Sequence, residues 1–104
     1  MATKKNAEVI SSPLGIHELE LALIREMAAY HDWDLRIAAQ ELQLMRRICR
    51  KTSWTEQYQP LVENLLDAVK ATAKTVRDKD TTLVTSAHTR LEQAVFALRD
   101  KLYA

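Results

Sequence analysis

The sequence predicts an all-α fold, an antiparallel bundle of long helices. The chain of 104 residues holds one glycine and two prolines, whereas sheets and tight loops usually need more of both. Strong helix formers, among them Ala, Leu, Glu, Lys and Arg, make up much of the remainder. The hydrophobic fraction of 47% is sufficient for a buried core, and the charged fraction of 28% for a polar surface. We expect a flexible tail over residues 1–12 and a single helical-bundle domain over residues 13–104.

The first helix is predicted from a long apolar pattern between Ile16 and Lys51, where neither Gly nor Pro occurs. Steps of four and three residues define a seam like that of a coiled coil. The seam consists of His17, Leu21, Ile24, Ala28, His31, Leu35, Ala38, Leu42, Met45 and Cys49. Because a turn normally resets the phase of such a pattern, we predict one continuous helix. The alternative is that Asp32 or Asp34 caps a new helix, which would give four helices in place of three.

Two further helices are predicted after this segment. Pro60 would cost a backbone hydrogen bond inside a helix, so the second helix either kinks near Glu56 or starts around Gln59. A polar turn over residues 77–80 follows it. Asp80 or one of the two threonines after it can cap the last helix, whose apolar stripe extends to Leu102.

The predicted lengths favour a dimer. At 1.5 Å per residue, the first helix would extend roughly 54 Å and the other two about 30–38 Å. Leaving the overhanging apolar rows in water would cost ~25 cal/mol per Å². A second copy related by two-fold symmetry, the commonest oligomer symmetry, would cover them. We therefore predict a homodimer that forms through the first helix. The candidate contact residues are Leu35, Leu42, Met45 and Trp33.

No catalytic constellation is present in the sequence. One glycine cannot build a glycine-rich phosphate loop, and no nucleophile elbow marks a Ser-His-Asp triad. Cys49 lies on the apolar seam, without a histidine placed to activate it. The sequence thus predicts a non-enzymatic interaction protein, such as an adaptor, chaperone or assembly factor, with no catalytic residue and no cofactor.

Two other functions remain open from the sequence. His17 and His31 lie two heptads apart on the seam and would be the ligands of a metal- or cofactor-binding bundle.

The last histidine, His88, has Glu92 four residues on, and we expect these two side chains to pair.

A basic patch gives the third function, nucleic-acid binding. It consists of Arg46, Arg47, Arg50 and Lys51. Cations in the last turns of a helix also complement the helix dipole, and a net charge of +1 provides no general attraction to polyanions. Nucleic acid is therefore the less favoured partner.

The sequence also bears on location. No apolar run is long enough to cross a bilayer, and the polar residues 1–6 are not followed by the apolar core of a signal peptide. A single cysteine, Cys49, fits a reducing compartment. We expect a cytoplasmic protein without a membrane partner.

One stretch resembles a known family. Gln57, Pro60, Leu61, Leu65, Leu66 and Asp67 are spaced as in the middle helix of small cytoplasmic flagellar export chaperones. The acid–Trp–acid run around Trp33 is similar in character. The resemblance covers a minor part of the chain and is in keeping with the interaction class.

Overall fold

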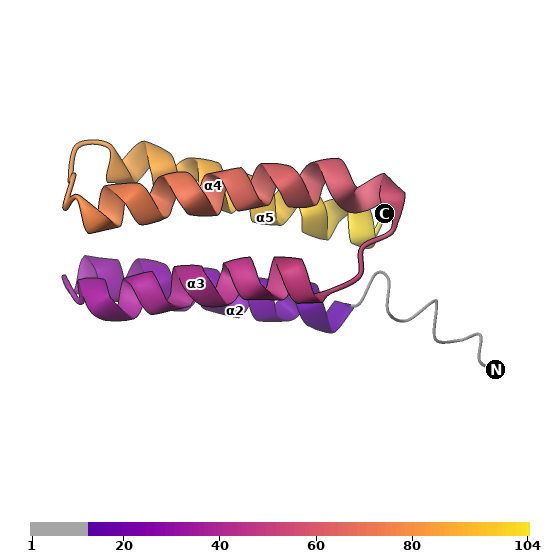
Figure 1. Cartoon of the computed structure of the whole chain (residues 1–104), viewed down its shortest axis with the longest axis horizontal. Coiled ribbons are helices and arrows are strands. Elements are labelled where there is room, and N and C mark those ends of the chain that lie inside the picture. The colour runs from indigo at the N-terminus through magenta and orange to yellow at the C-terminus, as the bar shows by residue number, and fades with distance from the viewer. Residues whose placement is uncertain (1–12) are drawn as a thin grey trace.

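The computed structural model describes residues 13–104, which form an antiparallel bundle of four α-helices (Figure 1). The helices are α2 (Pro13–His31), α3 (Leu35–Lys51), α4 (Gln59–Arg77) and α5 (Val84–Leu102), and a short 3-10 helix, η1 (Glu56–Tyr58), precedes α4. Successive helices pack side by side, and α5 closes the bundle against α2. The all-α prediction is confirmed. The predicted tail over residues 1–12 lies outside the described residues.

The turns that join α2 to α3 and α4 to α5 lie at one end of the bundle (Figure 1). The connection from α3 to α4, the start of α2 and the end of α5 lie at the other end. The chain therefore consists of two helical hairpins packed against each other, and any side-chain pair between α2 and α5 or between α3 and α4 joins one hairpin to the other.

The prediction of one continuous first helix is wrong, and the four-helix alternative is correct. The chain turns over residues 32–34. The N–H of Asp34 donates to the carbonyl of Ala29 (2.8 Å) and that of Trp33 to the carbonyl of Tyr30 (2.9 Å). These two bonds form the pattern that ends many helices, with the left-handed residue usually glycine. Here Trp33 adopts φ 60.

Asp34 then starts α3. Its side chain accepts a hydrogen bond from the N–H of Ile37 (3.2 Å), the standard N-cap interaction. Of the two aspartates considered as caps, Asp34 is the one used. The absence of glycine from this turn is what made the segment resemble an uninterrupted helix in the sequence.

The row of apolar residues that faces the core is not the same before and after this turn. In α2 the seam positions, from His17 to His31, are exposed, and the neighbouring row that contains Ile16 and Leu23 faces the core. In α3 the seam positions from Ala38 to Cys49 face the core. The four-and-three spacing continued through the turn in the sequence only because α2 carries apolar residues on its outer side as well as on its core side.

The four helices have similar lengths, which removes the predicted overhang. α2, α4 and α5 contain 19 residues each and α3 contains 17. Within residues 13–104 no helix extends far beyond its neighbours, so unequal helix lengths give no support to a dimer.

The turn between α4 and α5 repeats the construction of the first turn. Lys79 adopts φ 54, and the N–H of Asp80 donates to the carbonyl of Thr75 (2.9 Å). The Asp80 carboxylate accepts hydrogen bonds from the backbone N–H groups of Thr82 and Leu83. Both hairpins therefore close through a non-glycine left-handed residue followed by an aspartate whose carboxylate accepts backbone N–H groups, although the N-cap of α5 itself is Leu83.

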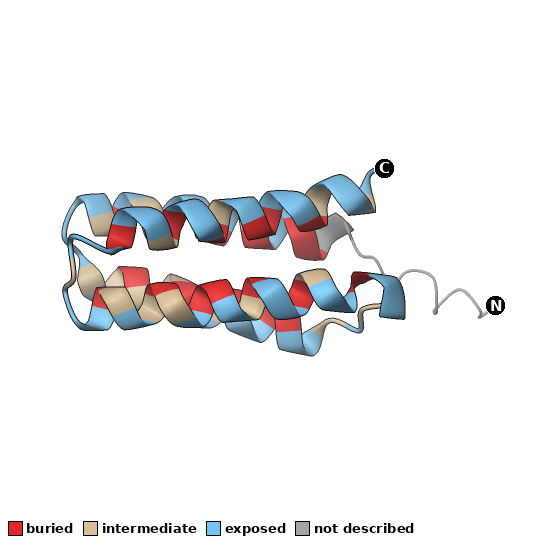
Figure 2. Cartoon of the chain, turned by 90° about the horizontal axis from the view of Figure 1, so that it is seen from above, coloured by how far each residue is buried: buried red, intermediate tan, exposed pale blue. Residues whose placement is uncertain are grey.

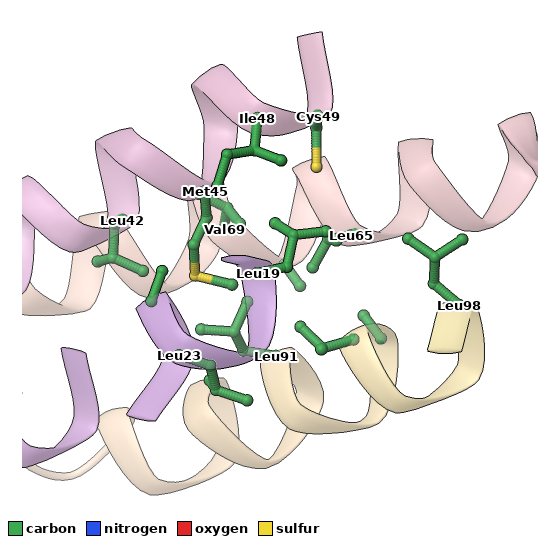
Figure 3. Packing of buried hydrophobic residues seen from close by; sticks show 14 of the residues in the cluster. Leu19, Leu23, Leu42, Met45, Ile48, Cys49, Leu65, Val69, Leu91 and Leu98 are labelled. Carbon is green, nitrogen blue, oxygen red and sulfur yellow. The ribbon is translucent and has the colours of Figure 1, made fainter. Parts of the chain in front are cut away.

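All four helices contribute to one hydrophobic core. Buried residues face the interior and exposed residues form the outside (Figure 2). Leucines dominate this core, and Met45 fills the space between them (Figure 3). The largest fully buried apolar side chains are Ile16, Leu19, Leu42, Met45, Leu65, Leu91, Val95 and Leu98.

Helix α4, which follows the connection from α3, begins at Gln59 and has Pro60 in its first turn, as one of the two predicted alternatives had it.

Candidate functional site

The outer face of α2 exposes apolar side chains that take no part in the packing of the core. This face consists of His17, Leu21, Ile24, Ala28 and His31, all exposed and spaced by four and three residues. Ile24 is 62% exposed and Leu21 40%. Large aliphatic side chains at the centre of a regular heptad row are typical of a surface that packs on another helix.

Two ion pairs flank this face and join α2 to its neighbouring helices. Arg25 bonds Glu41 of α3 (3.1 Å) at one edge. Glu20 bonds Arg99 of α5 (3.2 Å) at the other edge. The burial of Ile16, Leu19 and Leu23 on the opposite side of α2 keeps this face outward, and the two ion pairs lie along its edges.

The structure places the predicted contact residues in different surroundings. Leu42 and Met45 are fully buried among the chain's own helices (Figure 3), so we no longer propose them as contacts to a partner. Leu35 is partly buried against the same core. Trp33 is 51% exposed, in the turn after the outer face of α2, and its ring meets Tyr30 edge to face at 5.6 Å.

His17 and His31 lie near opposite ends of the outer face of α2. At 1.5 Å per residue, about 21 Å of helix separates them, which is too far for one chain to place both on one metal ion. Within residues 13–104, no three His, Cys, Asp or Glu side chains gather in a way that would hold a metal. The metal hypothesis therefore lacks a ligand set in the described part of the chain.

His88 and Glu26 form a buried pair that the sequence did not predict. Nε2 of His88 lies 2.8 Å from Oε2 of Glu26, and the Glu26 side chain is completely buried. The expected pairing of His88 with Glu92 is wrong, because His88 turns inward to α2. Tyr30 meets the imidazole edge to face at 5.4 Å.

This pair is largely enclosed, since the side chain of Glu26 is fully buried and that of His88 is 10% exposed. Oε1 of Glu26 and the Tyr30 hydroxyl are buried without a hydrogen-bond partner among the described residues. The sequence signal was an acidic residue on the α2 row that also carries Leu19, Leu23 and Tyr30. An acid at such a position needs a buried partner, but the sequence does not say which helix supplies it.

The four residues of the basic patch are all exposed, and they divide between two directions. Arg46 and Arg50 line a groove between α3 and α4, whereas Arg47 and Lys51 lie outside the lining of that groove. The patch predicted as one surface is thus split by the helical periodicity of α3.

Cys49 is buried in the core, and burial raises the pKa of its thiol to about 12. A thiol with such a pKa is protonated at neutral pH and is a poor nucleophile. Its backbone carbonyl accepts a hydrogen bond from Nε1 of Trp54 (3.0 Å). Trp54 therefore covers the end of α3, where helix carbonyls lack intrahelical partners.

Comparison with known proteins adds no family. The chain matches no protein-family model, and neither curated proteins nor solved structures give a significant match. Across the helices from residue 13 onward, none combines the length and apolarity needed to cross a bilayer.

Proposed function

We propose that the chain is a non-enzymatic interaction protein, a helical adaptor or assembly factor, and that the outer face of α2 binds a second copy of the chain. The observation that carries this proposal is the exposure of Ile24 and Leu21 at the centre of a heptad row. Covering such side chains on association removes apolar surface from water at ~25 cal/mol per Å².

The spacing of the face suits a helix as its partner. Alternating steps of four and three place the residues along one line, so that each side chain can enter a hole between residues of the facing helix. A two-fold axis lets the same row serve both copies. In an antiparallel pair, Leu21 of one copy packs on Ile24 of the other, and the small Ala28 leaves room near His17.

The charges beside the row are compatible with an antiparallel pair. Glu18 and Arg25 are both exposed and lie seven residues apart, hence on the same side of the row. Antiparallel pairing brings Glu18 of one copy beside Arg25 of the other, twice per dimer. The ion pair from Arg25 to Glu41 (3.1 Å) already holds the guanidinium at this edge.

The buried groups support a role outside catalysis. The histidine–carboxylate pair on α2 and α5 is enclosed by the core, and the thiol of Cys49 has a raised pKa. An enzyme of this size would need such groups in an open cleft, where a substrate can reach them.

The test is the oligomeric state of Ile24→Glu. Sedimentation equilibrium is expected to give a dimer for the unaltered chain and a folded monomer for Ile24→Glu, because the new carboxylate would be buried without a partner at the dimer centre. Leu83→Glu is the matched control. Leu83 is also a large exposed aliphatic residue, 54% exposed, but lies in the turn before α5.

The two variants carry the same change in charge, so a general repulsion between monomers would affect both equally. If the unaltered chain is monomeric at high concentration, the proposal that a second copy binds this face is wrong. Equal dissociation of both variants would contradict the assignment of the contact to α2.

A further inference from the structure

A groove runs between α3 and α4, away from the outer face of α2. Its volume is about 860 Å³. Leu66 and Ala73 of α4 line it and are partly exposed, whereas Leu42 and Val69 form its buried floor. From Glu63 to Arg77 the α4 wall rises about 21 Å at 1.5 Å per residue. The groove thus has an apolar lining and the length of several helical turns.

Cations line both walls of this α3–α4 groove. Arg46 and Arg50 come from α3, and Lys70, Lys74 and Arg77 come from α4. All five side chains are exposed.

Only some of these cations are neutralised. Lys74 and Arg77 share the carboxylate of Asp78, at 2.9 and 3.6 Å. In the part of the chain that the structure describes, Arg46 and Lys70 have no ion pair, and neither has Arg50 on the next turn of α3. Like charges four residues apart on a helix repel each other, and here two such pairs flank one groove. An anionic occupant would relieve this repulsion.

We propose that the α3–α4 groove binds an acidic amphipathic helix of a partner protein. The partly exposed Leu66 and Ala73 would receive the hydrophobic stripe of that helix, and its carboxylates would meet the cations on the two walls. This is the helix-in-groove mode of recognition, in which residues at helical spacing anchor the ligand. The inference goes beyond the proposed self-association and uses a different surface.

Nucleic acid is the less suitable ligand for this groove. None of the residues that line it is aromatic, so unpaired bases would find no stacking platform. Glu63 and Asp67 also lie on its α4 wall, so an acidic ligand would have to place its carboxylates over the five cations and away from these two residues.

The experiment uses the full chain and a labelled synthetic helix with leucines at positions i, i+3, i+4 and i+7 and glutamates elsewhere. Fluorescence anisotropy measures its Kd. The same peptide with lysines in place of the glutamates, and a single-stranded RNA oligonucleotide, are the comparison probes. We expect the acidic helix to bind at least about tenfold more tightly than either comparison probe, a difference of one order of magnitude in Kd.

Charge reversal within α3 provides a matched pair of variants. Arg46→Glu with Arg50→Glu reverses two cations in the groove, and Arg47→Glu with Lys51→Glu reverses two outside it. Both double variants have the same net charge. The first is expected to weaken acidic-helix binding by about tenfold or more and the second by about twofold or less, because only the first removes local contacts. Ile24→Glu should bind the peptide as the unaltered chain does.

Equal losses for the two double variants would overturn the proposal, since they would show a general charge effect. Tighter binding of the RNA than of the acidic helix would overturn it in favour of nucleic acid. Circular dichroism checks that each variant is folded. If the groove variant of α3 unfolds, Lys70→Glu on the opposite wall replaces it, and undiminished binding by Lys70→Glu would likewise overturn the proposal.

Discussion

Nε2 of His88 on α5 lies 2.8 Å from Oε2 of Glu26 on α2, and this pair joins the two helical hairpins inside the core. The two residues are 62 positions apart in the sequence. Tyr30 packs edge to face on the imidazole. The desolvation of a buried polar pair of this kind offsets much of its attraction, so the net contribution of the pair to stability is small.

The first prediction concerns the stability of this pair. His88→Leu leaves the Glu26 carboxyl buried without its partner and is expected to lower the free energy of unfolding by about 3 kcal/mol. Glu26→Leu combined with His88→Leu should recover most of that loss, since an apolar replacement of both members removes the desolvation cost. Urea unfolding of the single and double variants measures both effects. A double variant as unstable as the sum of the two single variants would show that the residues act independently.

The fold class was predictable because its signals are local. Low glycine and proline content, strong helix formers and regular apolar spacing all lie within single segments of the sequence. The start of α4 at Gln59 was one of the two alternatives that Pro60 left open, because its ring restricts the backbone near it. The break before α3 was not predicted, because Trp33 takes a left-handed conformation that glycine normally marks.

The candidate site was predictable only in part. The seam was found, but the sequence could not show that its α2 half faces solvent while its α3 half faces the core. That division depends on which side of α2 meets the other helices, and α2 is apolar on both sides. The partner of His88 and the cations that α4 places opposite Arg46 were not foreseen, because both depend on contacts between segments far apart in the chain.

The second prediction concerns the turn between α4 and α5. Lys79 holds φ 54, a conformation that costs a residue with a Cβ roughly 1–2 kcal/mol. Lys79→Gly is expected to raise the free energy of unfolding by about 1 kcal/mol, which corresponds to a rise in Tm of about 4–8 °C. Lys79→Ala is the control, because alanine removes the charge and keeps the Cβ. If alanine stabilises the chain as much as glycine does, the gain comes from the charge and not from the backbone.

The third prediction concerns alkaline pH. Burial raises the pKa of the Cys49 thiol in the folded chain from 9.0 to about 12. Between these two values the unfolded chain releases the thiol proton while the folded chain retains it, so the stability that is present below pH 9 is lost as the pH rises. This group alone lowers the free energy of unfolding by at most about 1.4 kcal/mol per pH unit.

Urea unfolding at a series of pH values, compared between the unaltered chain and Cys49→Ala, isolates this contribution from that of lysines and tyrosines. The difference in stability between the two proteins should change above pH 9 and stay constant below it. Parallel curves through this range would contradict a raised pKa. A thiol reagent at pH 8 should also react with Cys49 only after unfolding.

The fourth prediction separates the two halves of the seam. Leu42 in α3 is 1% exposed and Leu21 in α2 is 40% exposed, although both hold equivalent positions in the heptad pattern. Leu42→Ala should therefore lower the free energy of unfolding by about 2–5 kcal/mol, through lost burial and a cavity in the core. Leu21→Ala should cost less than about 1 kcal/mol in dilute protein, where the outer face of α2 meets water. Urea unfolding of the two variants at low protein concentration makes the comparison. Equal losses would mean that the α2 half of the seam is also buried within a single chain, and they would contradict both the rotation of α2 and the interaction face assigned to it.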